Sequence, residues 1–506
     1  MKRILYKKSR RLISALFLCI ILYLLACTII PPLIGTRTKS RELLSLPVPV
    51  AARIGLIDTN EAALEWRLRL INSAQEEIIL STFDFRADSS GTDILAALLH
   101  AAQRGVQIRL IVDGINAQLH LTGRSVFQAL AAHENVEVKL YNPIRLFKLW
   151  TINYRCHDKY LIVDRASYIM GGRNTSDLFL GSGGTSRRNT DHEVVVHDAG
   201  GIEELRADTA CTVSAADKAA LSGATFGSGA VFDSDAAFSF DSGKTSVAPL
   251  LNYFNDIWSQ SDNQAFFADA EKESVKAAVA ELAARWSEIS SERPLAPIDW
   301  ERETVQADGI TILSGDCSAR NKRPLLLNTL TELMRQAEES VILQTPYMIC
   351  NRTMYDALQS VAAGPAQVQV ITNAPQNGAN PWGCADYLHH RRNILATGVS
   401  VCEWIGDASM HTKTILIDHR ISLIGSFNWD MRSAYLDTEL MLLADCPALN
   451  DLLRKEASQM LQQGRLVAPD GTATEGSDYV LPESSPVHDF LQRILSILIQ
   501  PFRYVL

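Results

Sequence analysis

The chain has 506 residues, of which 47% are hydrophobic and 21% are charged, and its formal net charge is −9. This length and composition indicate a globular protein with room for two or more domains and exclude a largely disordered chain. The acidic balance counts against a protein that binds nucleic acid through a broad basic surface. None of the nine cysteines forms a closely spaced pair of the metal-binding type, so we expect mostly free, buried thiols.

The chain begins with a basic flank, residues 1–11, followed by residues 12–36, a stretch of 25 residues without a charged side chain. Such a stretch can cross a bilayer whose hydrocarbon core is about 30 Å thick, and the basic flank is then expected to stay in the cytoplasm. A cleaved signal peptide, or a lipoprotein precursor cleaved before Cys27, are the alternatives. Because the apolar run continues past Cys27, we predict an uncleaved single-pass anchor. A tether over residues 37–59 would then lead to a catalytic region outside the cytoplasm.

Residues 60–212 alternate between helical and strand patterns. The spacing of apolar residues predicts helices over 62–74 and 94–102 and strands over 78–82 and 106–113. Alternation of this kind is typical of layered α/β domains. We therefore expect residues 60–212 to form a first α/β domain.

The stretch HDKYLIVDRASYIMGGRN, residues 157–174, carries the polar groups of this domain. Two short apolar runs on either side of a polar turn predict a β-hairpin. Because side chains alternate between the two faces of a strand, His157 and Lys159 point the same way, and Asn174 is expected to return beside them. Asp164 lies too far along the strand to reach the same ligand, so we expect a structural role for it, as a buried ion pair or a turn contact.

The middle of the chain departs from the pattern. Residues 213–247 are rich in Gly, Ser, Ala and Asp and are interpreted as an insertion between the two halves. Residues 248–308 are expected to form a helical connection, with amphipathic helices over 247–258 and 271–289 and a linker after them.

Residues 309–480 repeat the order of the first domain, with predicted helices and strands over 330–337, 341–345, 354–361 and 368–372. The repeat includes a second polar stretch, HTKTILIDHRISLIGSFN. In this copy His411, Lys413, Asp418 and Asn428 stand at the same offsets as their counterparts in the first copy. We interpret the chain as an internal duplication and expect Asp418, like Asp164, to be structural.

One imidazole, one ammonium group and one amide on a shared face suit a phosphate group. We expect Lys159, Lys413, Asn174 and Asn428 to hold that phosphate. Two half-sites supply two histidines, so that one can attack phosphorus while the other protonates the leaving oxygen. Because two ammonium groups already neutralise the phosphoryl oxygens, we expect neither a metal nor another cofactor.

The paired His-x-Lys-x4-Asp stretches resemble the motifs of the phospholipase D superfamily. The continuation WDMRSAYLDTE after Asn428, with Gly-Gly-Arg-Asn at 171–174, is similar to the bacterial cardiolipin synthases, most nearly their type C branch. The resemblance implies two duplicated α/β/α phospholipase D-like domains, packed with pseudo-twofold symmetry around one active site.

The resemblance also implies roles for individual residues. By analogy His157 is the nucleophile and His411 is the acid and base. A glutamate downstream of each motif orients a histidine in this superfamily, and Asp191-His192-Glu193 and Asp437-Thr438-Glu439 follow the two copies. We therefore assign the histidine-orienting role to Glu193 and Glu439.

The implied activity is transfer of a phosphatidyl group to phosphatidylglycerol, giving cardiolipin in a bacterial cell membrane. The expected substrates are phospholipids, phosphatidylglycerol or phosphatidylethanolamine, with the donor left open, and no nucleic acid is expected as a partner. A hydrolytic phospholipase D and a nuclease-type phosphodiesterase are the alternatives. Since one chain carries both half-sites, a monomer is expected.

The C-terminal residues 487–506 combine a broad apolar surface with arginines and are too short to span a bilayer. They are expected either to pack on the domain or to lie in the membrane interface.

Overall fold

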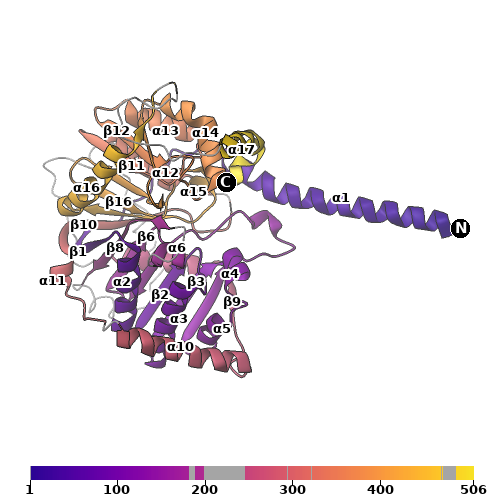
Figure 1. The fold of residues 1–506 in the computed structure, drawn as a ribbon, viewed down its shortest axis with the longest axis horizontal. Coiled ribbons are helices and arrows are strands. Elements are labelled where there is room, and N and C mark those ends of the chain that lie inside the picture. The colour runs from indigo at the N-terminus through magenta and orange to yellow at the C-terminus, as the bar shows by residue number, and fades with distance from the viewer. Residues whose placement is uncertain are drawn as a thin grey trace, which may run out of the picture.

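The computed structural model describes residues 2–181, 188–198, 245–292, 295–320, 322–468, 470 and 486–506. Figure 1 shows a layered α/β body from which a single long helix, α1 (Lys2–Gly35), projects. Most of the expected insertion at 213–247 lies outside the described residues.

A 16-stranded sheet runs through the whole body in the order β18-β13-β12-β11-β15-β16-β17-β10-β1-β8-β6-β5-β2-β3-β4-β9. The order is nearly palindromic about the antiparallel pair β1 and β10, so each strand of the first half has a counterpart in the second. The internal duplication predicted from the sequence therefore takes the form of a pseudo-twofold arrangement, with the two halves joined edge to edge.

In the first half, parallel strands β2, β3 and β4 are connected by helices and followed by a hairpin. The elements are β1 (Val50–Ile57), α2 (Asn60–Ser73), β2 (Glu77–Thr82), α3 (Ser89–Gln103), β3 (Gln107–Asp113), α4 (Gly114–His120), α5 (Ser125–Ala131), β4 (Val136–Tyr141), η1 (Leu149–Thr151), β5 (Tyr160–Val163), β6 (Ser167–Gly171), α6 (Asp177–Leu180), β7 (Asn189–Thr190), β8 (Glu193–His197), α9 (Ala248–Trp258), β9 (Gln264–Phe266) and α10 (Glu273–Glu292).

The second half repeats this plan with parallel strands β11, β12 and β13 and a second hairpin. Its elements are α11 (Trp300–Glu303), β10 (Val305–Ser314), α12 (Leu325–Arg335), β11 (Ser340–Gln344), α13 (Arg352–Ala362), β12 (Gln367–Asn373), α14 (Pro381–Leu395), β13 (Ser400–Trp404), β14 (Ser409–Met410), β15 (Thr414–Ile417), β16 (Ile421–Gly425), α15 (Met431–Tyr435), β17 (Leu440–Asp445), α16 (Pro447–Gln463), β18 (Arg465–Leu466), α17 (Pro486–Leu498) and η3 (Gln500–Val505).

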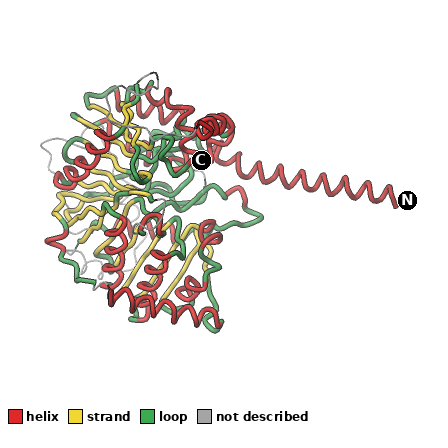
Figure 2. The backbone as a smooth tube through the Cα atoms, in the orientation of Figure 1, coloured by secondary structure: helices red, strands yellow, loops and turns green. Residues whose placement is uncertain are grey.

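The predicted α/β fold class is confirmed. Helices cover the sheet on both sides (Figures 1 and 2). Strands such as β5 and β16 are therefore buried on both faces, and their sequences are almost entirely apolar. Two hydrophobic cores result. One contains α2, α3 and α10, and the other contains α9, α12 and α16.

Two expected boundaries are wrong. Residues 37–59 are not wholly a tether, because β1 lies within them as a central strand between β8 and β10. The expected connection 248–308 contains the start of β10, and its helix α10 packs on α3 and α5 of the first half. In both places the pairing partners lie far away in the sequence, so a local pattern does not show which segments complete the sheet.

The C-terminal residues pack on the second half, where Arg503 forms an ion pair with Asp386 at 2.9 Å. The outer face of α17 remains exposed and apolar, however, with Phe490, Ile497 and Leu498 each more than 60% exposed. This tail lies beside the point where α1 meets the body (Figure 1).

Candidate active site

The two hairpins approach one another at the junction of the halves. Strand β14, just before His411, pairs with β7 of the first half, and an isolated bridge joins Cys156 to Thr438. These two contacts are related by the same pseudo-twofold arrangement as the sheet. Each His-x-Lys stretch is therefore anchored on a segment from the other half of the chain.

His157 is buried and is held by the second half. Its Nδ1 lies 2.9 Å from Oε1 of Glu439, to which an Nδ1–H donates, and its backbone N–H donates to Oγ1 of Thr438 at 3.2 Å. The ring of Phe83 packs edge-on against the imidazole at 5.0 Å between centroids. Glu439 also accepts hydrogen bonds from the hydroxyl groups of Ser426 and Ser433. When Nδ1 carries the proton and donates to Glu439, the lone pair of Nε2 of His157 is unprotonated.

His411 is also held by the first half, but its ring additionally contacts Lys413, whose Nζ lies 2.7 Å from Nδ1 and 3.2 Å from Nε2. Its Nδ1 lies 2.7 Å from Oδ2 of Asp191, and its backbone N–H donates to the carbonyl oxygen of Thr190 at 2.7 Å. Phe179 packs edge-on against the ring at 4.9 Å. Although burial acts to raise it, Lys413 and the bond to His411 keep the pKa of Asp191 below its usual value, so its carboxylate is charged.

The carboxylate that contacts His411 differs from the one expected. We expected Glu193, but the sheet register places it elsewhere. Gly171 of the first copy pairs with Glu193, whereas Gly425, at the same place in the second copy, pairs with Met441. Glu193 thus corresponds to Met441, and Asp191, two residues earlier, corresponds to the carboxylate that contacts His157.

Glu193 has a structural partner instead. Its two carboxylate oxygens accept hydrogen bonds from the guanidinium group of Arg67 at 2.6 and 2.7 Å, and Arg173 lies 3.7 Å away. All three side chains are buried. The expected histidine-orienting role of Glu193 is therefore wrong, whereas Glu439 lies where that role requires.

The two lysines act on both histidines. Burial, and then the charges of Lys159 and Lys413, lower the pKa of His157 well below its usual value. Burial and the same two lysines lower the pKa of His411 to about 3. The pKa of each imidazole is therefore lowered by the lysine of its own half and by the lysine of the other half. The two half-sites form one centre in which both histidines are neutral at rest and the two lysines lie near the carboxyl groups of Asp191 and Glu439.

The two asparagines flank this centre. Oδ1 of Asn174 accepts a long hydrogen bond of 3.4 Å from the backbone N–H of Asp84. Nδ2 of Asn428 lies 3.4 Å from the hydroxyl of Tyr347, and its Oδ1 has no hydrogen-bond partner among the described residues. Both side chains are buried yet weakly engaged, which leaves their amide groups available to a ligand.

Two glycines of the motifs allow the close approach of a carboxylate and of a neighbouring strand. A Cβ atom on Gly172 would lie 2.4 Å from Oδ2 of Asp191, and one on Gly425 would lie 2.1 Å from the carbonyl oxygen of Leu440. Neither distance is tolerable. The second copy has Ser426 where the first has Gly172, and the serine hydroxyl donates to Glu439.

Asp164 and Asp418 stand at the far ends of the hairpins, in turns with φ of 50° and 48°. Asp164 accepts hydrogen bonds of 2.8 to 3.0 Å from the backbone N–H groups of residues 75–77, and Asp418 accepts equivalent bonds from residues 338–340. The expected structural role is thus a turn contact rather than an ion pair, and neither carboxylate reaches the histidines.

We expect the affinity for a phosphate analogue to fall above neutral pH. Burial lowers the pKa of Lys413 to about 7, so its positive charge is lost as the pH rises through that value. The dissociation constant for tungstate should be constant at lower pH and should then rise up to tenfold per pH unit. Isothermal titration between pH 6 and 9 measures this. The Lys413→Met variant should bind tungstate weakly, and its dissociation constant should not rise with pH. A wild-type dissociation constant that is independent of pH would contradict a phosphate-binding role for Lys413.

Comparison with known proteins places this site in a family. The sequence profile described as "Cardiolipin synthase, PLD-like domain" matches twice, at residues 68–209 and 330–461. Each match contains one of the His-x-Lys stretches.

Full-length relatives show the same relationship. An uncharacterized protein of Helicobacter pylori strain J99 is 24% identical over 480 residues, which cover 87% of this chain and 86% of the relative. Cardiolipin synthase C of Escherichia coli K12 is 23% identical over 436 residues, covering 78% and 81%. Among solved structures, phosphatidylserine synthase of Haemophilus influenzae has a TM-score of 0.60 at 16% identity, over 91% of this chain and 98% of that one. That match supports the fold.

Proposed function

This chain belongs to the cardiolipin synthase, PLD-like domain family, and we propose that it makes cardiolipin by transphosphatidylation through a phosphohistidine intermediate. As a cardiolipin synthase-like member of that family it is an enzyme of phospholipid metabolism. The observation that carries the finer proposal is that two neutral imidazoles from separate halves, each paired with a carboxyl group, are both affected by the charges of Lys159 and Lys413.

In the first step, Nε2 of His157 attacks the phosphorus atom of the donor lipid. The P–O bond to the head group breaks, and the proton on Nε2 of His411 moves to the leaving oxygen. His411 acquires that proton when the substrate binds, because the phosphodiester anion offsets the charges of Lys159 and Lys413, which lower the histidine pKa in the empty site. The products are phosphatidyl-His157 and the free head group.

In the second step, a hydroxyl group of phosphatidylglycerol gives its proton to Nε2 of His411, and its oxygen attacks the same phosphorus. The N–P bond breaks, cardiolipin leaves, and His157 returns to its resting form. Glu439 and Asp191 hold each Nδ1–H throughout, which keeps both reacting Nε2 atoms aimed at the substrate. Lys159, Lys413, Asn174 and Asn428 hold the phosphoryl oxygens. No step requires a metal, so chelators should leave the activity unchanged.

His157 is the better candidate for the nucleophile because it is held more firmly. Its partner Glu439 accepts hydrogen bonds from the side-chain hydroxyl groups of Ser426 and Ser433, whereas the partner of His411, Asp191, accepts one from the backbone N–H of His192. His411 has greater side-chain exposure, 17% against 10%, which suits the exchange of protons with the leaving and entering groups.

We propose that α1 anchors the enzyme with its catalytic body on the outer side of the membrane. Residues Ser14–Gly35 form a helical stretch long and apolar enough to span a bilayer, and the basic residues before it favour the cytoplasm. The tail α17 would lie in the membrane interface beside it. Protease treatment of sealed, right-side-out cells tests the orientation. The body should be cut from outside, and cleavage only after lysis of the cytoplasmic membrane would refute it.

Expression in cells that lack cardiolipin tests the function. The wild-type chain should restore cardiolipin, and His157→Ala should not. Phosphatidic acid as the sole new lipid would indicate hydrolysis instead. Nicking of a plasmid by the purified enzyme without any change in lipids would indicate a nuclease-type phosphodiesterase.

A further inference from the structure

The segment between β4 and β5 contacts the end of α1 and is unusually apolar on its outside. Leu146 is 74% exposed and Phe147 is 89% exposed, and Trp150 in η1 is 48% exposed. Nδ2 of Asn153 donates to the carbonyl oxygen of Thr28 at 2.8 Å, which ties this segment to α1. Figure 2 shows it as a loop with one short helix on the side of the body from which α1 projects.

The length of α1 places this segment in the membrane. The helix runs for fourteen residues from Leu12 to Leu25, and Cys27 is the first buried position from Ser14 onwards, after which the helix packs against the body. At about 1.5 Å per residue they span roughly 21 Å, whereas the hydrocarbon core is about 30 Å thick. The remaining thickness of the hydrocarbon core must be spanned by helix residues that are already in contact with the body. The apolar surfaces of the 144–150 segment and of α17 must therefore sink into the near leaflet.

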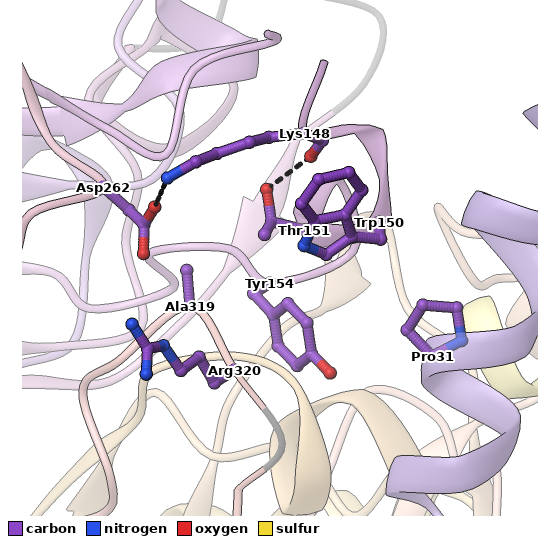
Figure 3. A pocket seen from close by; sticks show the side chains of 8 residues that line it. All are labelled: Pro31, Lys148, Trp150, Thr151, Tyr154, Asp262, Ala319 and Arg320. Carbon is purple, nitrogen blue, oxygen red and sulfur yellow. Dashed lines mark hydrogen bonds and ion pairs between the residues drawn. The ribbon is translucent and has the colours of Figure 1, made fainter. Parts of the chain in front are cut away.

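A cavity of about 440 Å³ lies at this level, between the end of α1 and the body (Figure 3). Pro31, Trp150 and Tyr154 form its apolar wall, and its charged groups are Lys148, Asp262 and Arg320. Lys148 forms an ion pair of 3.1 Å with Asp262, whereas Arg320 has no ionic partner within the part of the chain that the structure describes. Among the described residues, the cavity thus has one positive charge without a counter-charge, at the depth of the lipid head groups.

Resting on the proposed function, we propose that this cavity binds the phosphate of the acceptor phospholipid. Transfer to a lipid requires two phospholipids at once, and the donor phosphate occupies the centre between the histidines. The acceptor brings a second phosphate, which needs its own cationic partner. The cavity offers one, together with an apolar wall for the start of the acyl chains, and Tyr154 is only three residues before His157. None of its lining residues belongs to the phosphate-binding set of the catalytic centre.

The kinetic test replaces both cations, in Lys148→Gln/Arg320→Gln. With phosphatidylglycerol as acceptor, the apparent KM should rise about tenfold or more, the loss typical of charge-assisted hydrogen bonds. Transfer to ethanol, a soluble acceptor without a phosphate, should be unchanged. The control is Arg323→Gln, since Arg323 lies three residues from Arg320 but pairs with Glu42 and Asp316 outside the cavity. Equal losses with both acceptors, or no change with either, would overturn the proposal.

A binding measurement separates this proposal from the proposed function. Titration of the inactive His157→Ala chain with dihexanoyl phosphatidylglycerol should show two lipid molecules bound per chain. The triple variant His157→Ala/Lys148→Gln/Arg320→Gln should bind one. Two molecules in both would overturn the cavity assignment even if the enzyme makes cardiolipin. Absence of cardiolipin synthesis by the wild-type chain would instead refute the proposed function, whatever the stoichiometry.

Discussion

Replacing His157 with alanine is expected to lower kcat for phosphatidyl transfer by about 10⁴-fold or more, because the covalent route then has no nucleophile. The two lysines and two asparagines remain, so the apparent affinity for the donor lipid should change by less than about tenfold. The measurement is release of the head group from a labelled donor in mixed micelles. His197→Ala is the control, since His197 is a half-buried histidine at the end of β8 that stacks on Trp300 outside the centre.

His411→Ala should be equally inactive towards natural lipids but not towards an activated one. A 4-nitrophenyl leaving group needs no proton, so the first step should survive and give a burst of one nitrophenolate per chain before turnover stops. A burst in His157→Ala and none in His411→Ala would reverse the two roles. Near-wild-type turnover in either variant with a natural lipid would refute the mechanism.

Asp191→Asn and Glu193→Gln should fail in different ways, although the two residues are separated by only one position. Asp191→Asn should keep the fold and lose about 10²- to 10⁴-fold in kcat, because His411 loses the carboxylate that fixes its Nδ1–H. Glu193→Gln should lose about 3–5 kcal/mol of stability, because it leaves the buried guanidinium of Arg67 without its counterion.

Thermal unfolding and kinetics on the same detergent-solubilised samples distinguish the two outcomes. Asp191→Asn should unfold near the wild-type temperature, and Glu193→Gln should unfold well below it with near-normal activity in the folded fraction. If Glu193→Gln were stable and inactive, the sequence-based assignment would stand and the structural one would be wrong.

Much of the fold follows from local patterns. The apolar runs on either side of Asp164 and Asp418 predict both hairpins to within a residue, because each strand and its turn lie within a dozen positions. The repetition of His-x-Lys at equal spacing likewise shows that the chain is duplicated. These features depend on residues that are neighbours in sequence.

The rest depends on register and on contacts between distant segments. The carboxylate that meets His411 stands 20 residues after Gly171, whereas its counterpart stands 14 residues after Gly425, because the connections after the two hairpins differ in length. The repeated Asp-x-Glu pattern therefore matches Glu193 with Glu439, whereas the pairing of β6 with β8 and of β16 with β17 matches Asp191 with Glu439. Each histidine is paired with a carboxyl group from the other half of the chain, His157 with Glu439 and His411 with Asp191. No local sequence pattern predicts this exchange of partners.

Trapping the intermediate tests the central claim most directly. Wild-type enzyme is mixed with a donor lipid labelled at phosphorus, quenched within one turnover, and digested under alkaline conditions that preserve phosphohistidine. We expect the label on the peptide that contains His157, lost on addition of phosphatidylglycerol as labelled cardiolipin forms. Cardiolipin formed at full rate with no protein-bound label at any time in the turnover, or with the label on a residue other than the two histidines, would contradict the mechanism.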